Sequence, residues 1–365
     1  MPGTAIPMGI SRTDKKPGGP KPHVPLTVVT GFLGAGKTTL INRLLREPEL
    51  SGTAVIVNEF GDIALDHLLY ETAGDGIIEI ASGCVCCSVR GELAEALERL
   101  LRAADNGRIA TFRRVIVETT GLADPGPILA VLTRHPYLRL RFRLDRIVTA
   151  VDALHGLATL DAHDEAVRQA AAADTIVLTK TDQAGDVTEL RKRLAQLNPV
   201  ARFIEAADAG TALLTDAPAI TGAVQRWLPA EEVNADQSAH AIASSAFVSE
   251  RSMTAEVLDA FIERLASDFA GRLIRVKGLV RNGADPERPF VIHGVQGVYA
   301  PPVLWKTWPD GDRRSRLVVI GRDFAPDAVE RLFDAFLGEV RPDGPDRQAL
   351  EDNPLAIAGF RPGIR

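Results

Sequence analysis

The sequence predicts an α/β protein with a mostly parallel sheet, followed by a smaller α+β domain. Short apolar stretches alternate with amphipathic helical stretches from residue 25 to about residue 228, which is typical of a parallel sheet with helices on both faces. Polar motifs stand directly after several apolar stretches, where the strands of such a sheet would end. Beyond residue 228, strand-like segments with two helical ones indicate a separate antiparallel sheet.

Changes of composition divide the chain into five segments. Residues 1–24 are rich in Pro, Gly and Lys and lack the apolar run of a signal peptide, so we expect a disordered leader. The remaining segments are the first domain at 25–228, a polar linker at 229–241, the second domain at 242–340 and a mobile tail at 341–365.

Composition favours a cytoplasmic protein that binds neither membranes nor nucleic acids. The net charge is −6 over 365 residues, and no apolar run is long enough for a membrane span. Without an export signal we expect the reducing cytoplasm, where thiols stay reduced. Arg139, Arg141 and Arg143 alternate with apolar residues, and we interpret them as one solvated strand face instead of a nucleic-acid site.

The first domain opens with a phosphate-binding loop. An apolar strand at 26–30 precedes G-F-L-G-A-G-K-T at 31–38, and helical spacing follows. This is the G-x-x-x-x-G-K-[ST] pattern of P-loop NTPases, whose backbone N–H groups bind phosphate. Lys37 would reach the β- and γ-phosphates, and the Thr38 hydroxyl would bind Mg²⁺. The predicted loop residues are Gly31, Gly34, Ala35, Gly36, Lys37 and Thr38.

Later strands also end in residues that carry chemistry, and these would share one edge of the sheet. Glu118 follows an apolar strand and would hold the hydration shell of Mg²⁺, while the Gly121 amide would contact the γ-phosphate. Lys37, Glu118 and Gly121 are therefore the predicted catalytic residues, although Glu118 could also be an ordinary acid at a strand end. The residue that orients the attacking water stays open, with Asp124 and Glu59 as candidates.

T-K-T-D at 179–182 follows another apolar strand and indicates guanine recognition. Asp182 can accept hydrogen bonds from guanine N1–H and the 2-amino group, and the Lys180 stem can lie against the ring. A turn that caps the strand is the alternative. With the phosphate loop upstream, we expect a GTP site that includes Thr179, Lys180 and Asp182.

All three cysteines of the chain, Cys84, Cys86 and Cys87, stand in one short loop. Core packing, a disulfide and C-x-x-C redox chemistry are weaker interpretations than metal binding, because clustered thiolates select ions such as Zn²⁺, Cu⁺ or Co²⁺. No second cysteine pair closes a structural zinc site, so any remaining ligand comes from Glu59, Asp62, His67 or water, or else is missing. Such an open shell suits an ion that is handed on. His67 and, in the second domain, His293 are more typical of ordinary histidines.

Taken in order, G-F-L-G-A-G-K-T-T-L, N-E-F-G-D, G-C-V-C-C, V-E-T-T-G-L-A-D-P and T-K-T-D resemble the CobW family of metallochaperone GTPases, which includes zinc and cobalt chaperones. The resemblance covers most of 25–228 and, more loosely, 242–340. It implies Mg²⁺–GTP on the phosphate loop including Thr39, and a metal site on the three cysteines near the acids of the N-E-F-G segment. Two features depart from the family: Asp62 stands where many members have glutamate, and a histidine-rich loop is absent.

The resemblance implies a GTPase that loads Zn²⁺, or alternatively Co²⁺, into an apo client metalloprotein. GTP–Mg²⁺ would favour metal capture and hydrolysis would favour release. A signalling or assembly GTPase with incidental cysteines, and a metal buffer without catalysis, are the alternatives. The client and the oligomeric state stay open, with a homodimer among the options.

Overall fold

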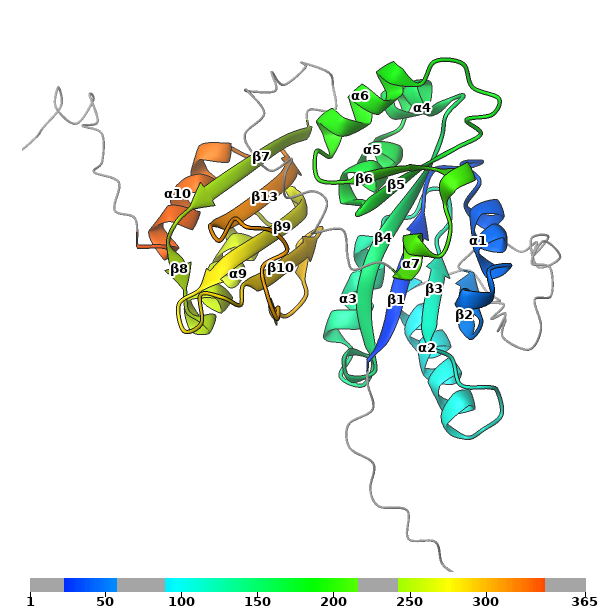
Figure 1. The fold of residues 1–365 in the computed structure, drawn as a ribbon, viewed down its shortest axis with the longest axis horizontal. Helices are drawn as coiled ribbons and strands as arrows, with labels where there is room; N and C mark the ends of the chain where they lie inside the picture. Colours follow the sequence, from blue (N-terminus) through cyan, green and yellow to red (C-terminus); the bar gives the residue numbers. More distant parts are fainter. Residues whose placement is uncertain (1–22, 58–88, 216–241, 339–365) are drawn as a thin grey trace, which may run out of the picture. The chain divides into compact units, whose positions relative to one another are not determined.

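The computed structural model describes residues 23–57, 89–215 and 242–338 (Figure 1). The chain divides into two compact units, Met1–Arg226 and Trp227–Arg365. The expected linker, tail and cysteine loop lie outside the described residues, as do residues 1–22 of the expected leader. The last leader residue, Val24, is instead the first residue of a strand.

The described residues of the first unit form a six-stranded, fully parallel sheet in the order β2-β3-β1-β4-β5-β6. Its strands are rich in β-branched residues, and β5 is buried at every position, as expected where helices cover both faces. The predicted parallel α/β fold is therefore confirmed. The strands are β1 (Val24–Thr30), β2 (Thr53–Val57), β3 (Arg114–Glu118), β4 (Phe142–Asp152), β5 (Thr175–Thr179) and β6 (Arg202–Glu205).

Helices pack on both faces of this sheet (Figure 1). Leu40, Ile41 and Leu44 of α1 join Leu213 and Leu214 of α7 in one core cluster against the strands, while α3 and α5 contact β4 and α2 packs on α3. The helices are α1 (Lys37–Leu45), α2 (Val89–Asp105), α3 (Gly126–Arg134), α4 (Gly156–Ala162), α5 (Asp164–Ala172), α6 (Thr188–Leu197) and α7 (Ala212–Thr215), with 3-10 turns η1 (Pro48–Leu50), η3 (Leu138–Leu140) and η4 (Ala206–Asp208).

The strand order positions the site. The connection after β1 runs to β2 on one side of the sheet, whereas the connection after the neighbouring strand β3 runs to β4 on the other side. The direction of winding therefore reverses between β1 and β3, and the crevice at such a point is where open α/β sheets bind ligands. The glycine-rich loop leaves the sheet at this position.

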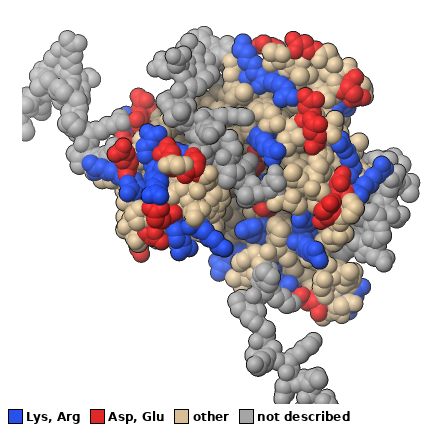
Figure 2. Space-filling view, in the orientation of Figure 1, with Lys and Arg blue, Asp and Glu red and all other residues tan. Residues whose placement is uncertain are grey.

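One local expectation is wrong. The segment with Arg139, Arg141 and Arg143 is not one strand, because η3 ends at Leu140 and β4 begins only at Phe142. Arg141 donates from Nη1 to Asp105 Oδ2 at 2.8 Å, and it also contacts Tyr137, so it belongs to a local polar cluster. On the face in view, acidic and basic side chains of the first unit are interspersed (Figure 2).

The second unit has the predicted antiparallel sheet, in the order β11-β10-β9-β13-β7, with β12 paired to β10. The two-residue β8 is an exception, since it pairs with β9 in parallel. The elements are β7 (Ile242–Ser249), β8 (Ser252–Met253), α9 (Ala255–Asp268), β9 (Leu273–Asn282), β10 (Phe290–Val295), β11 (Val298–Tyr299), β12 (Val303–Leu304), β13 (Ser315–Arg322) and α10 (Pro326–Phe336).

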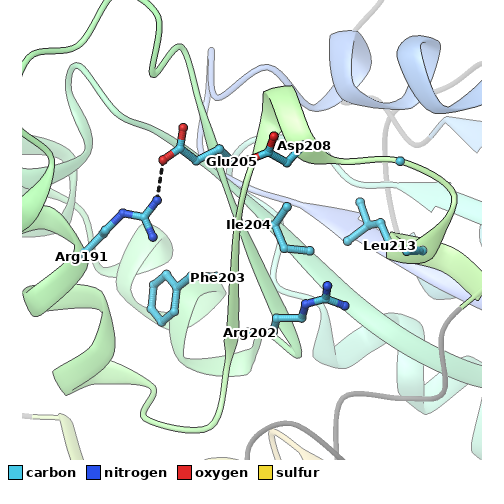
Figure 3. Close-up of a pocket in the computed structure, with 9 residues that line it drawn as sticks. Arg191, Arg202, Phe203, Ile204, Glu205, Asp208 and Leu213 are labelled. Carbon is cyan, nitrogen blue, oxygen red and sulfur yellow. Dashed lines mark hydrogen bonds and ion pairs between the residues drawn. The ribbon is translucent and has the colours of Figure 1, made fainter.

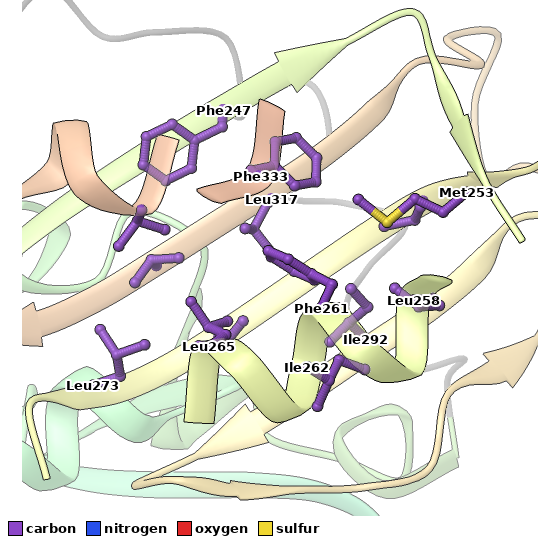
Figure 4. Close-up of a cluster of buried hydrophobic side chains, with 14 of the residues drawn as sticks. Phe247, Met253, Leu258, Phe261, Ile262, Leu265, Leu273, Ile292, Leu317 and Phe333 are labelled. Carbon is purple, nitrogen blue, oxygen red and sulfur yellow. The ribbon is translucent and has the colours of Figure 1, made fainter. Parts of the chain in front are cut away.

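The core of the second unit lies between α9, α10 and one sheet face (Figure 4). Phe261 of α9 is fully buried, with its ring centroid 5.7 Å from that of Phe333 and 5.6 Å from that of Phe336. Thr254 caps α9 by accepting a hydrogen bond from the Val257 N–H. No helix of the described residues is both long and apolar enough to cross a membrane.

Candidate nucleotide site

The glycine-rich loop connects β1 to α1 and lies close to β4. A Cβ atom on Gly31 would stand 2.3 Å from the Ala150 carbonyl oxygen, so only glycine fits there. Gly34 and Gly36 have φ angles of 71° and 82°, a region that residues with a side chain rarely adopt. The backbone is thereby shaped into a concave turn at the N-terminus of α1, which is the arrangement that binds phosphate.

Lys37 is the first residue of α1 and is buried. Its Nζ donates to the Gly31 carbonyl at 2.9 Å and to the Phe32 carbonyl at 3.2 Å, so the ammonium lies within its own loop. A lysine charge held here is available to the terminal phosphates of a nucleotide bound in the turn.

Thr38 and Glu118 bring two oxygen groups together from α1 and β3. The Thr38 hydroxyl donates to Glu118 Oε1 at 2.7 Å, and the Glu118 side chain is 5% exposed. A hydroxyl beside a buried carboxylate is the donor set that Mg²⁺ prefers, and the residues therefore fit Mg²⁺ next to the phosphate loop. Val57, the last residue of β2, pairs with Glu118 in the sheet.

The loop after β3 is anchored to β1 and packed on the phosphate loop. The Thr119 N–H donates to the Val29 carbonyl at 3.0 Å, and its hydroxyl donates to Thr30 Oγ1 at 2.8 Å. A Cβ on Gly121 would stand 2.6 Å from the Leu33 nitrogen and 2.7 Å from its Cα. Gly121 is therefore required by close approach of two backbones.

The T-K-T-D segment lies beside the same loop. The Thr179 hydroxyl donates to the Ala35 carbonyl at 2.8 Å, which ties the end of β5 to the glycine-rich turn. Lys180 has a φ of 57°, and its Nζ donates to Asp152 Oδ2 at 2.6 Å. Asp182 is exposed and accessible to a ligand.

Asp152, the last residue of β4, is the hub of several polar contacts. Burial alone would raise the pKa of its carboxyl group, but hydrogen bonds from Lys180, from the Leu154 N–H and from His155 lower the pKa below its ordinary value. Asp152 thus stays ionised and holds Lys180. A cavity of about 300 Å³ adjoins this hub and is lined by residues that include Phe32, Gly34, Asp152, His155, Gln169 and Lys180.

A second cavity, of about 310 Å³, lies alongside the edge strand β6 (Figure 3). Arg191 and Glu205 form an ion pair at its rim, with Nη2 to Oε1 at 2.7 Å. The adjoining η4 is held by Arg43 of α1, which donates to the carbonyls of Ala206 and Ala207. The phosphate-loop helix therefore also supports the loop after β6, a contact with no signal in the sequence.

The structure brings together most of the predicted nucleotide residues. Lys37, Thr38, Glu118, Gly121 and Thr179 lie around one turn, with the exposed Thr39 next in α1. Asp124, a candidate to orient water, accepts a hydrogen bond from the Gly126 N–H at 3.2 Å and lies 3.9 Å from Arg168 Nε. The predicted metal residues Glu59, Asp62, Cys84, Cys86 and Cys87, and also His67, lie outside the described residues.

Comparison with known proteins gives matches over both units. Residues 25–205 match the "CobW/HypB/UreG, nucleotide-binding domain" model, and residues 242–337 match the "Cobalamin synthesis protein cobW C-terminal domain" model. The chain is 34% identical over 315 residues to the zinc chaperone YjiA of Escherichia coli K12, covering 85% of this chain and 98% of YjiA. It is 31% identical over 346 residues to the zinc chaperone CobW of a Sinorhizobium species, covering 84% and 95% of the two chains.

A solved structure agrees with these matches. The crystal structure of Zn(II)-bound YjiA GTPase from E. coli superposes with a TM-score of 0.67 at 30% identity, covering 87% of this chain and 99% of that one. Both domains and nearly the full length of the relatives are thus represented here. The chain therefore belongs to the CobW family, which includes the zinc chaperones YjiA and CobW.

Proposed function

We propose that this protein is a GTP-dependent metallochaperone, which binds Zn²⁺ at the cysteine motif and uses GTP binding and hydrolysis to load the ion and release it to a client protein. The observation that carries the proposal is the Thr38–Glu118 pair beside Lys37, at the point where the phosphate loop leaves the sheet. A nucleoside triphosphate and its Mg²⁺ would use these three side chains together.

In this proposal, different residues around the loop bind the phosphates, the Mg²⁺ and the guanine base of GTP. The loop N–H groups and Lys37 bind the phosphates, and Asp182 with the Lys180 stem recognises guanine. Thr38 would bind Mg²⁺ and Glu118 its hydration shell. Mg²⁺ would neutralise charge on the phosphates when it is bound. The Gly121 amide would donate to the γ-phosphate, so the loop after β3 distinguishes GTP from GDP.

The cargo site would be formed by Cys84, Cys86 and Cys87 with Glu59 and Asp62 nearby. The names of the relatives as zinc chaperones favour Zn²⁺, and Co²⁺ is the alternative ion. The pairing of Val57 with Glu118 supports a link between the two sites, because the N-E-F-G-D motif begins at the next residue. The thiolates require reducing conditions, so we propose that the protein acts in the cytoplasm. Its client there would be a metalloprotein in the apo form.

A linkage titration tests this function. We expect Zn²⁺ to bind about tenfold more tightly in GTP–Mg²⁺ than in GDP–Mg²⁺, because coupling between two sites is commonly about 1–3 kcal/mol. Competition with a chromogenic chelator measures the zinc affinity, with a non-hydrolysable GTP analogue and with GDP. Equal affinities would reject metal loading controlled by GTP.

Two variants separate the proposal from its alternatives. Replacing the three cysteines together by serine removes zinc binding but keeps GTP hydrolysis, whereas a signalling GTPase would keep its cellular activity in this variant. Lys37→Ala should abolish both hydrolysis and cellular activity, whereas a metal buffer would still function. Cellular rescue under zinc limitation and phosphate release are the two measurements.

A further inference from the structure

The loop after β3 is held by a buried glutamine of α5. Gln169 is 1% exposed, and its Nε2 donates to the Gly121 carbonyl at 3.1 Å and to the Ala123 carbonyl at 3.0 Å. These acceptors lie 48 and 46 residues away in the sequence. The neighbouring Arg168 lies 3.9 Å from Asp124, so α5 contacts the loop through two successive residues.

Gln169 retains its polar group at a cost. Its Oε1 is buried and has no hydrogen-bond partner among the described residues, which is unfavourable for an amide oxygen in a core. A leucine would fill this position on the buried face of α5 without that cost. The two donated hydrogen bonds are the feature that an apolar side chain would not supply.

These bonds complete a set of anchors on both sides of one peptide. Thr119 is fixed to β1 through its N–H and its hydroxyl, while the carbonyls of Gly121 and Ala123 are fixed by Gln169. The peptide between Thr120 and Gly121, which carries the Gly121 N–H, lies between these anchors. On its other side Gly121 packs against Leu33 of the phosphate loop.

We infer that Gln169 is a positioning residue, which aims the Gly121 N–H at the γ-phosphate. This inference rests on the proposed function, since Gln169 has this role only if the Gly121 N–H binds the γ-phosphate of GTP. Loss of the two hydrogen bonds therefore lowers the affinity for GTP and slows its hydrolysis. The affinity for GDP stays unchanged, because GDP lacks the γ-phosphate.

The test compares Gln169→Leu and the near-isosteric Gln169→Met with Asn198→Leu in the full-length chain. Asn198 is a matched control: it is fully buried and donates to the carbonyls of Ala170, Ala171 and Ala173 at the end of α5. Among the described residues, its side chain makes no hydrogen bond to the loop after β3. We measure the affinities for GDP and for a non-hydrolysable GTP analogue by fluorescence titration, and kcat and KM by phosphate release. Hydrogen exchange reports the mobility of residues 119–125.

In both Gln169 variants we expect about a tenfold loss of affinity for the GTP analogue and a lower kcat, with the GDP affinity within about twofold and faster exchange in the loop. Asn198→Leu should lower stability but keep the ratio of the two affinities. An equal loss for GDP and the GTP analogue, an unchanged ratio, or the same change in Asn198→Leu would overturn the inference.

The two proposals fail in different ways. A wild-type protein that binds both nucleotides but hydrolyses no GTP would reject the proposed function, and the affinity ratio would still decide the role of Gln169. A wild-type protein that binds no guanine nucleotide would reject both. If Gln169→Leu does not fold, Gln169→Met and the exchange measurement decide the outcome.

Discussion

At the scale of single residues, the site depends on close approach as much as on charge. Gly121 contacts the backbone of Leu33 and accepts a hydrogen bond from Gln169, so one residue is confined from two sides. Lys37 and Thr38 are likewise held by the loop and by Glu118. The conformation of the loop after β3 is therefore coupled to that of the phosphate loop.

Gly121→Ala tests this confinement. The added Cβ would stand 2.6 Å from the Leu33 nitrogen, so one loop must shift, and a displacement near 1 Å lowers catalysis by about a hundredfold. Phosphate release measures the rate. Gly185→Ala is the matched control, because a Cβ there meets no atom within 4 Å, and it should retain the wild-type rate. Wild-type hydrolysis in Gly121→Ala would contradict this account.

At the scale of elements, the sequence was sufficient where a local pattern carries the structure. The glycine spacing of the phosphate loop and the apolar runs of β1, β3 and β5 identify each element because burial and backbone geometry act over a few residues. Contacts made by Arg43, Asp152 and Gln169 were missed, because their partners are backbone atoms or side chains far away in the sequence. Alternation alone also failed to distinguish η3 from a strand.

Residues at the start of β13 and just before it form a compact charged group, and the pH dependence of its contribution to stability can be measured. Arg316 donates to Asp310 at 3.0 and 3.1 Å and lies 5.8 Å from the centre of the Trp308 ring. Hydrogen bonds from the Arg314 side chain are the main cause that lowers the pKa of Asp312 from 3.8 to about 2. Burial opposes this shift, while the Arg314 N–H and the charge of Arg316 add to it. Its carboxylate therefore stabilises the folded state.

Asp312→Asn should remove this stabilisation. Because the pKa of Asp312 is lower in the folded state, its carboxylate stabilises the fold fully at pH values above the unfolded-state pKa near 4. This stabilisation is lost as the pH falls towards about 2. We expect the variant to lose about 1 kcal/mol at pH 7, since the carboxylate is partly exposed, and to show a flatter stability profile between pH 4 and 2. Urea unfolding at pH 7 and between pH 4 and 2 measures the free energy of unfolding of both proteins. Glu287→Gln, which breaks an exposed pair with Arg313, should change stability little, and equal effects would refute the assignment.

At the scale of the whole molecule, each unit carries its own core. The cluster around Phe261 and Phe333 belongs to the second unit, and the cluster on α1 and α7 belongs to the first. Separate cores predict separate cooperative transitions, because each unit buries enough apolar surface of its own.

Phe261→Ala and added nucleotide should act on different transitions. Removing the fully buried ring should cost about 3–5 kcal/mol in the second unit alone, while GTP–Mg²⁺ at 100 times its Kd should stabilise the first by about 2.7 kcal/mol. Calorimetry of the full chain with and without nucleotide resolves the two. A single transition that both changes shift together would show that the units unfold as one.

The Arg43 contact fixes α1 at a second place, in addition to the glycine-rich turn at its N-terminus. The nine residues of this helix span about 13 Å from the glycine-rich turn, and the guanidinium of Arg43 in its last turn reaches the carbonyls that follow β6. A rigid rod fastened at both places cannot tilt at one without pulling on the other. A shift of the glycine-rich turn would therefore be transmitted through α1 to the loop after β6.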